Sequence, residues 1–166
     1  FSDAAELFVF LSGYVFGLVY MKVLLTQGFR ACYAKAVHRF WELYRGNALT
    51  FLVCMSIACY YFTQHGFILL ETDTFLEDPA RLLPKGLLLY YLPFGFGILP
   101  LYMVLLLLMP ALLWLHWRRP RTAIAVSVGL YLFAQLFPEF NLPRYRPSLG
   151  SDGHWYFNVL AWQLLF

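Results

Sequence analysis

Charged residues are scarce in this sequence of 166 residues. Only 13% of the residues are Asp, Glu, Lys or Arg, whereas 61% are hydrophobic and the mean hydropathy is +0.64. A water-soluble domain of this length needs far more polar surface, so the composition excludes that class and predicts a membrane protein. The aromatic fraction of 20% agrees with this prediction, because Trp and Tyr collect at membrane interfaces.

Motifs that carry familiar chemistry are also missing. The sequence has no glycine-rich phosphate loop, no cluster of metal ligands, and no Ser, His and Asp in a catalytic order. Its three cysteines, Cys32, Cys54 and Cys59, lack the spacing of metal ligands and are interpreted as buried free thiols. We therefore expect no bound metal or cofactor, and the cysteines do not identify a redox compartment.

Long apolar runs make up much of the sequence. A helix needs about 20 mostly apolar residues to cross a bilayer, and four stretches approach that length, at 7–25, 48–70, 97–117 and 122–137. A fifth run begins near Tyr156. We predict an all-α fold, a polytopic bundle of transmembrane helices. Because residue 1 is not Met and the last residues lie within an apolar run, we expect an internal piece of a longer polypeptide.

The basic residues of the connections orient these predicted spans. Lys and Arg collect in cytoplasmic loops, and eight of the twelve lie in the connections 22–45 and 118–121. We predict that both connections face the cytoplasm, and that Phe1, the acidic segment 71–78 and the stretch 153–158 lie on the outer side. Residues 28–47 are predicted to form an amphipathic helix that leads into the second span. Residues 78–93 are predicted to form an interfacial helix broken near Pro84.

Two carboxylates precede the first apolar run. Asp3 and Glu6 are three residues apart, so on a helix they share one face, which continues to Gly13 and Gly17. An ionisable group below the interface is costly and usually faces a cavity or a partner. The alternative is that both lie in water at a helix N-terminus, where negative charge is favourable. Glu6 lies deeper and is the better candidate for a functional carboxylate, whereas the glycine pair is interpreted as close helix packing.

A group of basic and aromatic residues lies where the second span begins. It consists of His38, Arg39, Tyr44 and Arg45. One interpretation is that these residues anchor the helix at the cytoplasmic face. The other is a site for a phosphorylated donor, because Arg presents a planar fork of donors to phosphate.

Polar residues also occur near the last apolar run. His154, Trp155 and Asn158 lie in the stretch GHWYFN, which is interpreted either as part of an aromatic belt or as a carbohydrate contact. Gln135 and Gln163 lie inside apolar runs and are expected to form interhelical hydrogen bonds.

Several stretches resemble one known family in the same order along the chain. SDAAELFVFLSGYVFGLVY, followed by KAVHRFWELY, resembles the OpgC family, membrane proteins that succinylate osmoregulated periplasmic glucans in Gram-negative bacteria. The resemblance continues through ILPLYMVLLLLMPALLWL, LFAQLF, NLPRY and HWYFNVLAWQLLF, and so covers nearly the whole chain. FVFLSGY is also similar to the FFVLSG-type signature of the broader membrane acyltransferase superfamily.

The resemblance implies an integral inner-membrane acyltransferase with about ten helices. This chain would supply about five of them, as part of a single domain truncated at both ends. The donor would be an acyl-coenzyme A, with succinyl as the expected group, and the acceptor would be a glucan hydroxyl in the periplasm. The family's first helix, with its Arg and Asp-His residues, would precede Phe1. Gly97 departs from the family, because we expect an acidic residue there in many relatives.

These observations combine into one mechanistic hypothesis. A histidine of the missing helix would act as general base, oriented by Glu6 or, as the weaker choice, by Asp3. Arg39 and Arg45 would bind the donor phosphates, assisted by the neighbouring His38 and Tyr44. The acceptor would bind at His154, Trp155 and Asn158.

Other functions remain open at this stage. Within the same class, the protein would transfer an acetyl group or would modify another polysaccharide or a lipid. A transporter or flippase would use the carboxylate as a proton relay, but paired broken helices are not evident. A structural or sensory subunit is disfavoured by the clustering of polar groups at both faces. The expected partners are membrane lipid, an acyl-coenzyme A and a glucan, and no nucleic acid.

Overall fold

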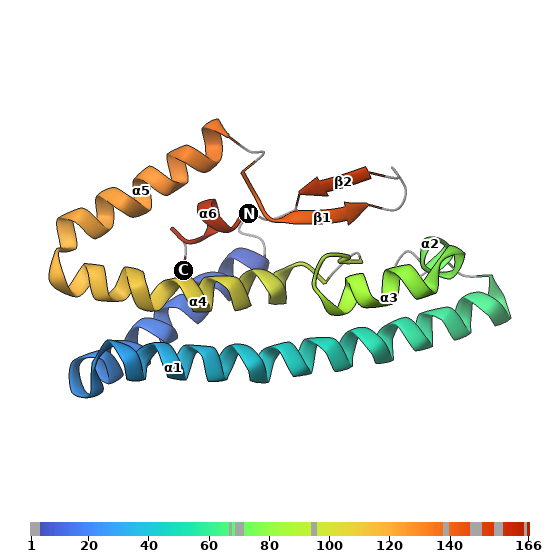
Figure 1. The fold of residues 1–166 in the computed structure, drawn as a ribbon, viewed down its shortest axis with the longest axis horizontal. Coiled ribbons are helices and arrows are strands. Elements are labelled where there is room, and N and C mark those ends of the chain that lie inside the picture. Colours follow the sequence, from blue (N-terminus) through green and yellow to red (C-terminus); the bar gives the residue numbers. More distant parts are fainter. Residues whose placement is uncertain are drawn as a thin grey trace.

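The computed structural model describes residues 4–66, 68, 72–93, 96–137, 140–146, 151–154, 158–164 and 166. The described elements are almost all helical, which confirms the predicted helical class, and one short hairpin is added (Figure 1). The helices are α1 (Ala4–His65), α2 (Thr72–Glu77), α3 (Pro79–Leu87), α4 (Ile98–Arg118), α5 (Pro120–Leu136) and α6 (Val159–Trp162). The antiparallel hairpin consists of β1 (Pro143–Arg146) and β2 (Ser151–His154).

Gly28 divides α1 into a first arm, residues 4–27, and a second arm, residues 29–65. Its φ of 85° and ψ of 176° interrupt the helix, and glycine adopts a positive φ at little cost because it has no Cβ. The chain reverses direction there, so the two arms meet at a sharp angle at one end of the molecule (Figure 1). The second arm is about 55 Å long at about 1.5 Å per residue. The predicted amphipathic helix 28–47 and most of the predicted span 48–70 are therefore one continuous helix.

α4 packs against both arms of α1 and runs antiparallel to the second (Figure 1). Their shared core joins Val9 and Phe16 of the first arm, Ala36 of the second arm, and Leu101 and Leu105 of α4. Small side chains on the second arm, Cys32 and Ala36, are fully buried and allow this close approach. The apolar face of the amphipathic segment therefore packs on a helix.

Two described helices, α1 and α4, are long and apolar enough to cross a membrane. The predicted fourth span is a helix, α5, but it has 17 residues, and α6 has only four. The predicted bundle of five spans is not seen in the described part of the chain. Residues of the predicted second span, Phe51 and Met55, instead pack with Phe75, Leu82 and Tyr91 in a separate core beside α2 and α3. The reason is that Gly46 stays helical, so the second arm continues straight past α4.

α3 is shorter than the predicted interfacial helix and is not broken at Pro84. Asp78 caps its N-terminus, because the carboxylate accepts a hydrogen bond from the Arg81 backbone N–H at 3.2 Å, and Pro79 occupies the first helical position. Pro84 lies inside the helix, which ends at Leu87. Gly86 meets the ring of Phe51, and an added Cβ would collide with that ring. α3 is thereby fixed against the second arm.

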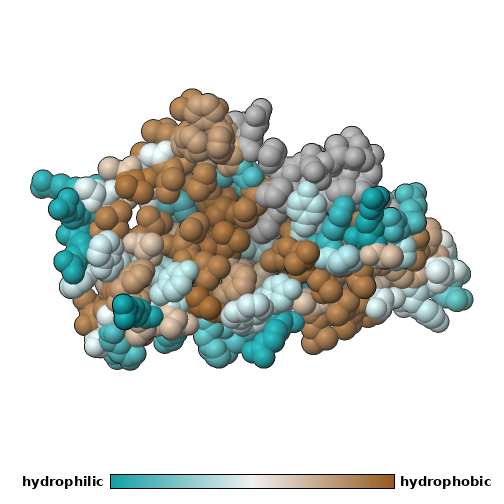
Figure 2. All heavy atoms as spheres, in the orientation of Figure 1, coloured by the Kyte–Doolittle hydropathy of each residue, from teal (hydrophilic) through white to brown (hydrophobic). Residues whose placement is uncertain are grey.

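The interpretation of the glycine pair is confirmed at Gly13 and not at Gly17. A Cβ at Gly13 would collide with the backbone of Phe166, whereas no atom lies within 4 Å of the corresponding position at Gly17. Gly17 instead borders an open groove of about 410 Å³ between the first arm and the residues Leu164 and Phe166. Much of the face shown in Figure 2 is apolar, and on the first arm the side chains of Leu11, Tyr14 and Leu18 are exposed. Such exposure is expected where helices face lipid or other helices.

Candidate functional site

A polar stripe runs along the second arm of α1. Its members are spaced three and four residues apart, so at about 100° per residue they cover about one third of the helix circumference. All are exposed, and they are Lys35, His38, Arg39, Glu42 and Arg45. The neighbouring face of the same helix is buried at Cys32, Ala36 and Asn47.

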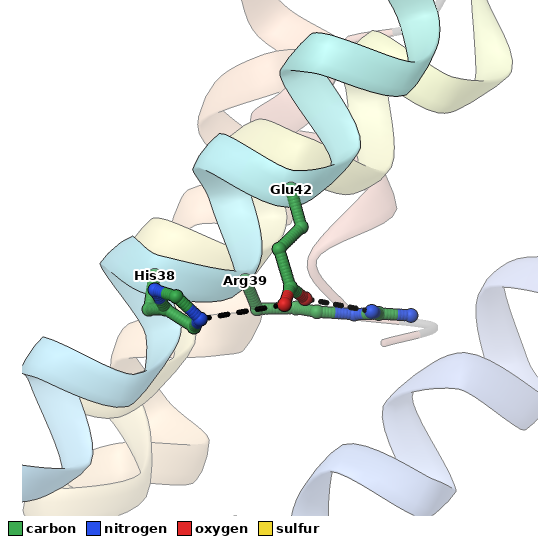
Figure 3. Close-up of polar contacts among 3 residues, drawn as sticks. All are labelled: His38, Arg39 and Glu42. Atoms are coloured by element: carbon green, nitrogen blue, oxygen red, sulfur yellow. Dashed lines mark hydrogen bonds and ion pairs between the residues drawn. The ribbon is translucent and has the colours of Figure 1, made fainter.

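Glu42 is the acidic centre of the polar stripe. Arg39 Nη1 donates a hydrogen bond to Glu42 Oε2 at 2.9 Å, and His38 Nε2 lies 3.3 Å from Glu42 Oε1 (Figure 3). Arg45 also interacts electrostatically with Glu42. The Glu42 carboxylate therefore offsets part of the positive charge of Arg39 and Arg45, the predicted donor residues. It also fixes the Arg39 side chain.

Arg39 also interacts with the first arm and with α4. Its charge interacts with Tyr20 of the first arm and with Tyr102 near the N-terminal end of α4. The Nζ atom of Lys35 lies 5.6 Å from the centre of the Tyr20 ring, a cation–π contact. The side chain of Arg39 remains 53% exposed. The guanidinium thus lies near Tyr20 of the first arm and Tyr102 of α4, and it remains accessible.

Glu6 lies at the same end of α4 as Arg39. It is exposed in the first turn of α1, where negative charge is favourable. Two residues later, the Phe8 ring packs edge-on against Tyr102, with ring centroids 5.8 Å apart. Asp3 lies outside the described residues, so its pairing with Glu6 stays a prediction.

The packing of the second arm separates Arg39 from Lys22 and Arg30, which belong to the same predicted connection 22–45. Phe29 contacts Trp114, with ring centroids 6.1 Å apart, whereas Arg39 interacts with Tyr102. Tyr102 and Arg118 are separated by about 24 Å of helix at about 1.5 Å per residue. Arg39 and Arg118 therefore lie near opposite ends of α4, although the loop charges assigned both to one face. The physical cause is the reversal at Gly28, which directs the connection back along α4.

Tyr44 contributes to packing between α1 and α3. Its hydroxyl donates a hydrogen bond to the Leu87 carbonyl at 3.0 Å, and its ring lies beside those of Phe40 and Trp41. This bond ties the second arm to the C-terminal end of α3. A role of Tyr44 in donor binding stays a prediction.

The predicted acceptor residues lie near the hairpin and α6. Asn158 caps α6, because its side-chain oxygen accepts a hydrogen bond from the Leu160 backbone N–H at 2.9 Å. His154 is the last residue of β2 and pairs with Pro143, and Trp155 lies outside the described residues. Acceptor binding by His154, Trp155 and Asn158 therefore stays a prediction.

The predicted interhelical hydrogen bond of Gln163 is confirmed. Its Nε2 atom donates to the Ser127 carbonyl, and the Ser127 hydroxyl donates to Gln163 Oε1, both at 2.8 Å. This pair joins α6 to α5. Gln135 is exposed on α5.

A second cationic group, which the sequence reasoning used only for orientation, lies at the other end of α4. We call it the cationic end, and it comprises Lys22, Arg30, Arg118, Arg119 and Arg121. The bend of α1 and the α4–α5 turn lie at the same end of the molecule (Figure 1), and hydrophilic atoms cover the turn (Figure 2). The Arg118 guanidinium lies 5.7 Å from the Trp114 ring centre and 5.2 Å from that of Trp117.

The cationic end differs from the polar stripe in its charge balance. Glu42 pairs with His38 and Arg39, whereas no ion pair involves the cationic end within the ranges that the structure describes. The signal was present in the sequence, because no acidic residue occurs between Glu6 and Glu42 or between Asp78 and Glu139. The cationic end can therefore bind a multiply charged anion without competition from a neighbouring carboxylate.

Comparisons with known proteins identify one family. The sequence model of a family described as OpgC protein matches residues 1–166, the whole chain. The same chain matches no curated protein and no solved structure.

Proposed function

This chain belongs to the OpgC family, and from that premise we propose that it is part of a membrane O-acyltransferase. The enzyme transfers a succinyl group from its coenzyme A thioester to hydroxyls of periplasmic glucans, in the inner membrane of a bacterium. The observation that carries this proposal is the family match over residues 1–166. The apolar helices α1 and α4 support a location in the membrane.

The proposed reaction is a simple acyl transfer. The oxygen of a glucan hydroxyl attacks the thioester carbonyl carbon, a C–O bond forms, and the C–S bond breaks. The hydroxyl proton passes to a general base, and coenzyme A leaves as the thiol after protonation. In our proposal the base is a histidine outside this chain, and Glu6, or less directly Asp3, orients it.

Convergence at one end of α4 supports a single reaction site. Reacting atoms must approach to about 3–3.5 Å, so the donor and the base have to meet. The donor is proposed to bind through Arg39, with His38, Tyr44 and Arg45 on the same arm. Because Phe8 and Arg39 both interact with Tyr102, the candidate carboxylate and the candidate donor site share this end of α4.

The acceptor completes the proposed site. We propose that the glucan binds at His154, Trp155 and Asn158, where aromatic and polar groups occur together in the sequence. The donor is consumed as a substrate, so the proposal includes no resident cofactor or metal.

Mass spectrometry of glucans tests the proposed function. A strain that lacks the gene is complemented with the full-length gene or with an empty vector. We expect the full-length gene to restore glucans that carry succinyl groups, each adding one negative charge. Glucans that stay unmodified, although the protein accumulates in the membrane, would contradict the proposal. Acetylated glucans would favour the alternative acyl group.

A further inference from the structure

We propose that Arg39 binds the free carboxylate of a dicarboxylic acyl group, while the donor's phosphates bind at the cationic end of α4. The donor then lies along α4 in an extended form, with its thioester near Tyr102. This inference rests on the proposed function, and it names the part of the donor that each cationic group recognises.

The geometry of Arg39 fits a carboxylate. In the structure its Nη1 atom already donates to a carboxylate oxygen, that of Glu42, at 2.9 Å. A guanidinium has five N–H donors in a planar fork, so a second carboxylate can bind while Glu42 keeps its bond. The side chain of Arg39 is 53% exposed and lies near enough to Tyr20 and Tyr102 to interact with them electrostatically. The hydroxyl of the half-buried Tyr102 can donate a further hydrogen bond to the same bound group.

The charges of the two cationic groups indicate which part of the donor each one binds. Phosphates carry several negative charges, and Glu42 at the centre of the polar stripe would repel them. The cationic end has five positive side chains and no ion pair in the described part of the chain. A single carboxylate suits the polar stripe, and a group of phosphates suits the cationic end.

The separation of the two sites fits one extended molecule. Tyr102, beside Arg39, and Arg118, at the cationic end, are about 24 Å apart along α4 at about 1.5 Å per residue. The pantetheine arm of coenzyme A joins its phosphates to the thioester as a long, flexible chain and can bridge such a span. An acetyl group has no free carboxylate for Arg39 to bind. Arg39 is therefore a determinant of donor choice.

Two matched donors test this inference with the full-length protein. One is succinyl-coenzyme A, and the other is its methyl ester, which has the same acyl chain without the charge. We expect the wild type to prefer succinyl-coenzyme A in kcat/KM, and Arg39→Gln to lower this value at least tenfold while changing that of the methyl ester less than twofold. Arg39→Lys keeps a charge in the same place and should retain part of the preference.

Variants at the two ends should give different results. Arg118→Gln combined with Arg119→Gln should raise KM for both donors by a similar factor and leave their ratio unchanged. Arg81→Gln, at an exposed position of α3, is the matched control and should change KM for neither donor.

The possible failures are distinguishable. If the wild type transfers neither acyl group, the proposed function is wrong, and this inference fails with it. If the wild type transfers succinyl but Arg39→Gln lowers both donors equally, only this inference is wrong. A change of the donor ratio in the Arg118 and Arg119 variant would also overturn it.

Discussion

At the scale of single residues, the sequence predicts the residue types of the polar stripe but not which residues of other helices lie beside it. The types and positions of Arg39 and Arg45 predict donor residues, but they do not predict that Arg39 lies near Tyr102. Spacing of three and four residues predicts the contact with Glu42, which the structure confirms at 2.9 Å. The proximity of Arg39 to α4 depends on the bend at Gly28, which residue type alone does not reveal.

Glu6 has a testable role at this scale. Glu6→Gln removes the charge that is proposed to orient the general base, and it keeps the size of the side chain. Because general-base catalysis contributes about 10²–10⁴-fold, we expect kcat for succinyl transfer to fall at least tenfold, with unchanged protein levels. Initial rates with the full-length protein measure this. Glu77→Gln on α2 is the matched control, and an unchanged rate in Glu6→Gln would remove Glu6 from the mechanism.

Glu42 gives a prediction in the opposite direction. Its carboxylate holds Arg39 and also competes with an acidic acyl group for the same guanidinium. Glu42→Gln should therefore lower KM for succinyl-coenzyme A several-fold and leave KM for the methyl-ester donor unchanged. Steady-state kinetics with both donors provide the measurement. A higher KM for succinyl-coenzyme A would mean that Glu42 positions Arg39 rather than competing for it.

At the scale of elements, periodicity predicted the helices well and their partners poorly. The helices at 98–118 and 120–136 nearly coincide with the predicted runs. Counting apolar runs cannot determine which helices pack side by side, because that depends on small buried positions such as Cys32 and Ala36. It also cannot determine where a helix continues through a glycine, as it does at Gly46 and does not at Gly28. The second arm therefore continues beyond the predicted bundle.

The two glycines of the first arm provide a matched pair for a stability measurement. Gly13→Ala places a Cβ against the backbone of Phe166, whereas Gly17→Ala meets no atom within 4 Å. We expect Gly13→Ala to destabilise the protein by about 1–3 kcal/mol, as overpacking does. Gly17→Ala should be neutral or stabilising by up to about 1 kcal/mol, because Ala favours the helix. Thermal unfolding of the full-length protein in detergent compares them, and equal midpoints would contradict the close packing at Gly13.

At the scale of the whole molecule, basic side chains lie near both ends of α4, with the polar stripe at one end and the cationic end at the other. Loop charges grouped Arg39 with Arg118 because both follow apolar runs, and this grouping ignored the direction in which the second arm runs. The contact of Phe29 with Trp114 and the proximity of Arg39 to Tyr102 agree with a second arm that runs antiparallel to α4 (Figure 1). The polar stripe and the cationic end are consequently separated by most of the length of α4.

Labelling of single cysteines from the two sides of the membrane tests this central claim most directly. The native residues Cys32, Cys54 and Cys59 are replaced by Ala, and Arg45→Cys or Arg119→Cys is introduced into the full-length protein. Because Arg45 lies just beyond Arg39 on the second arm and Arg119 follows α4, a membrane-impermeant maleimide should reach the two positions from opposite sides. Modification of both positions from the same side would contradict the antiparallel packing, and with it the assignment of separate donor sites to the two ends of α4.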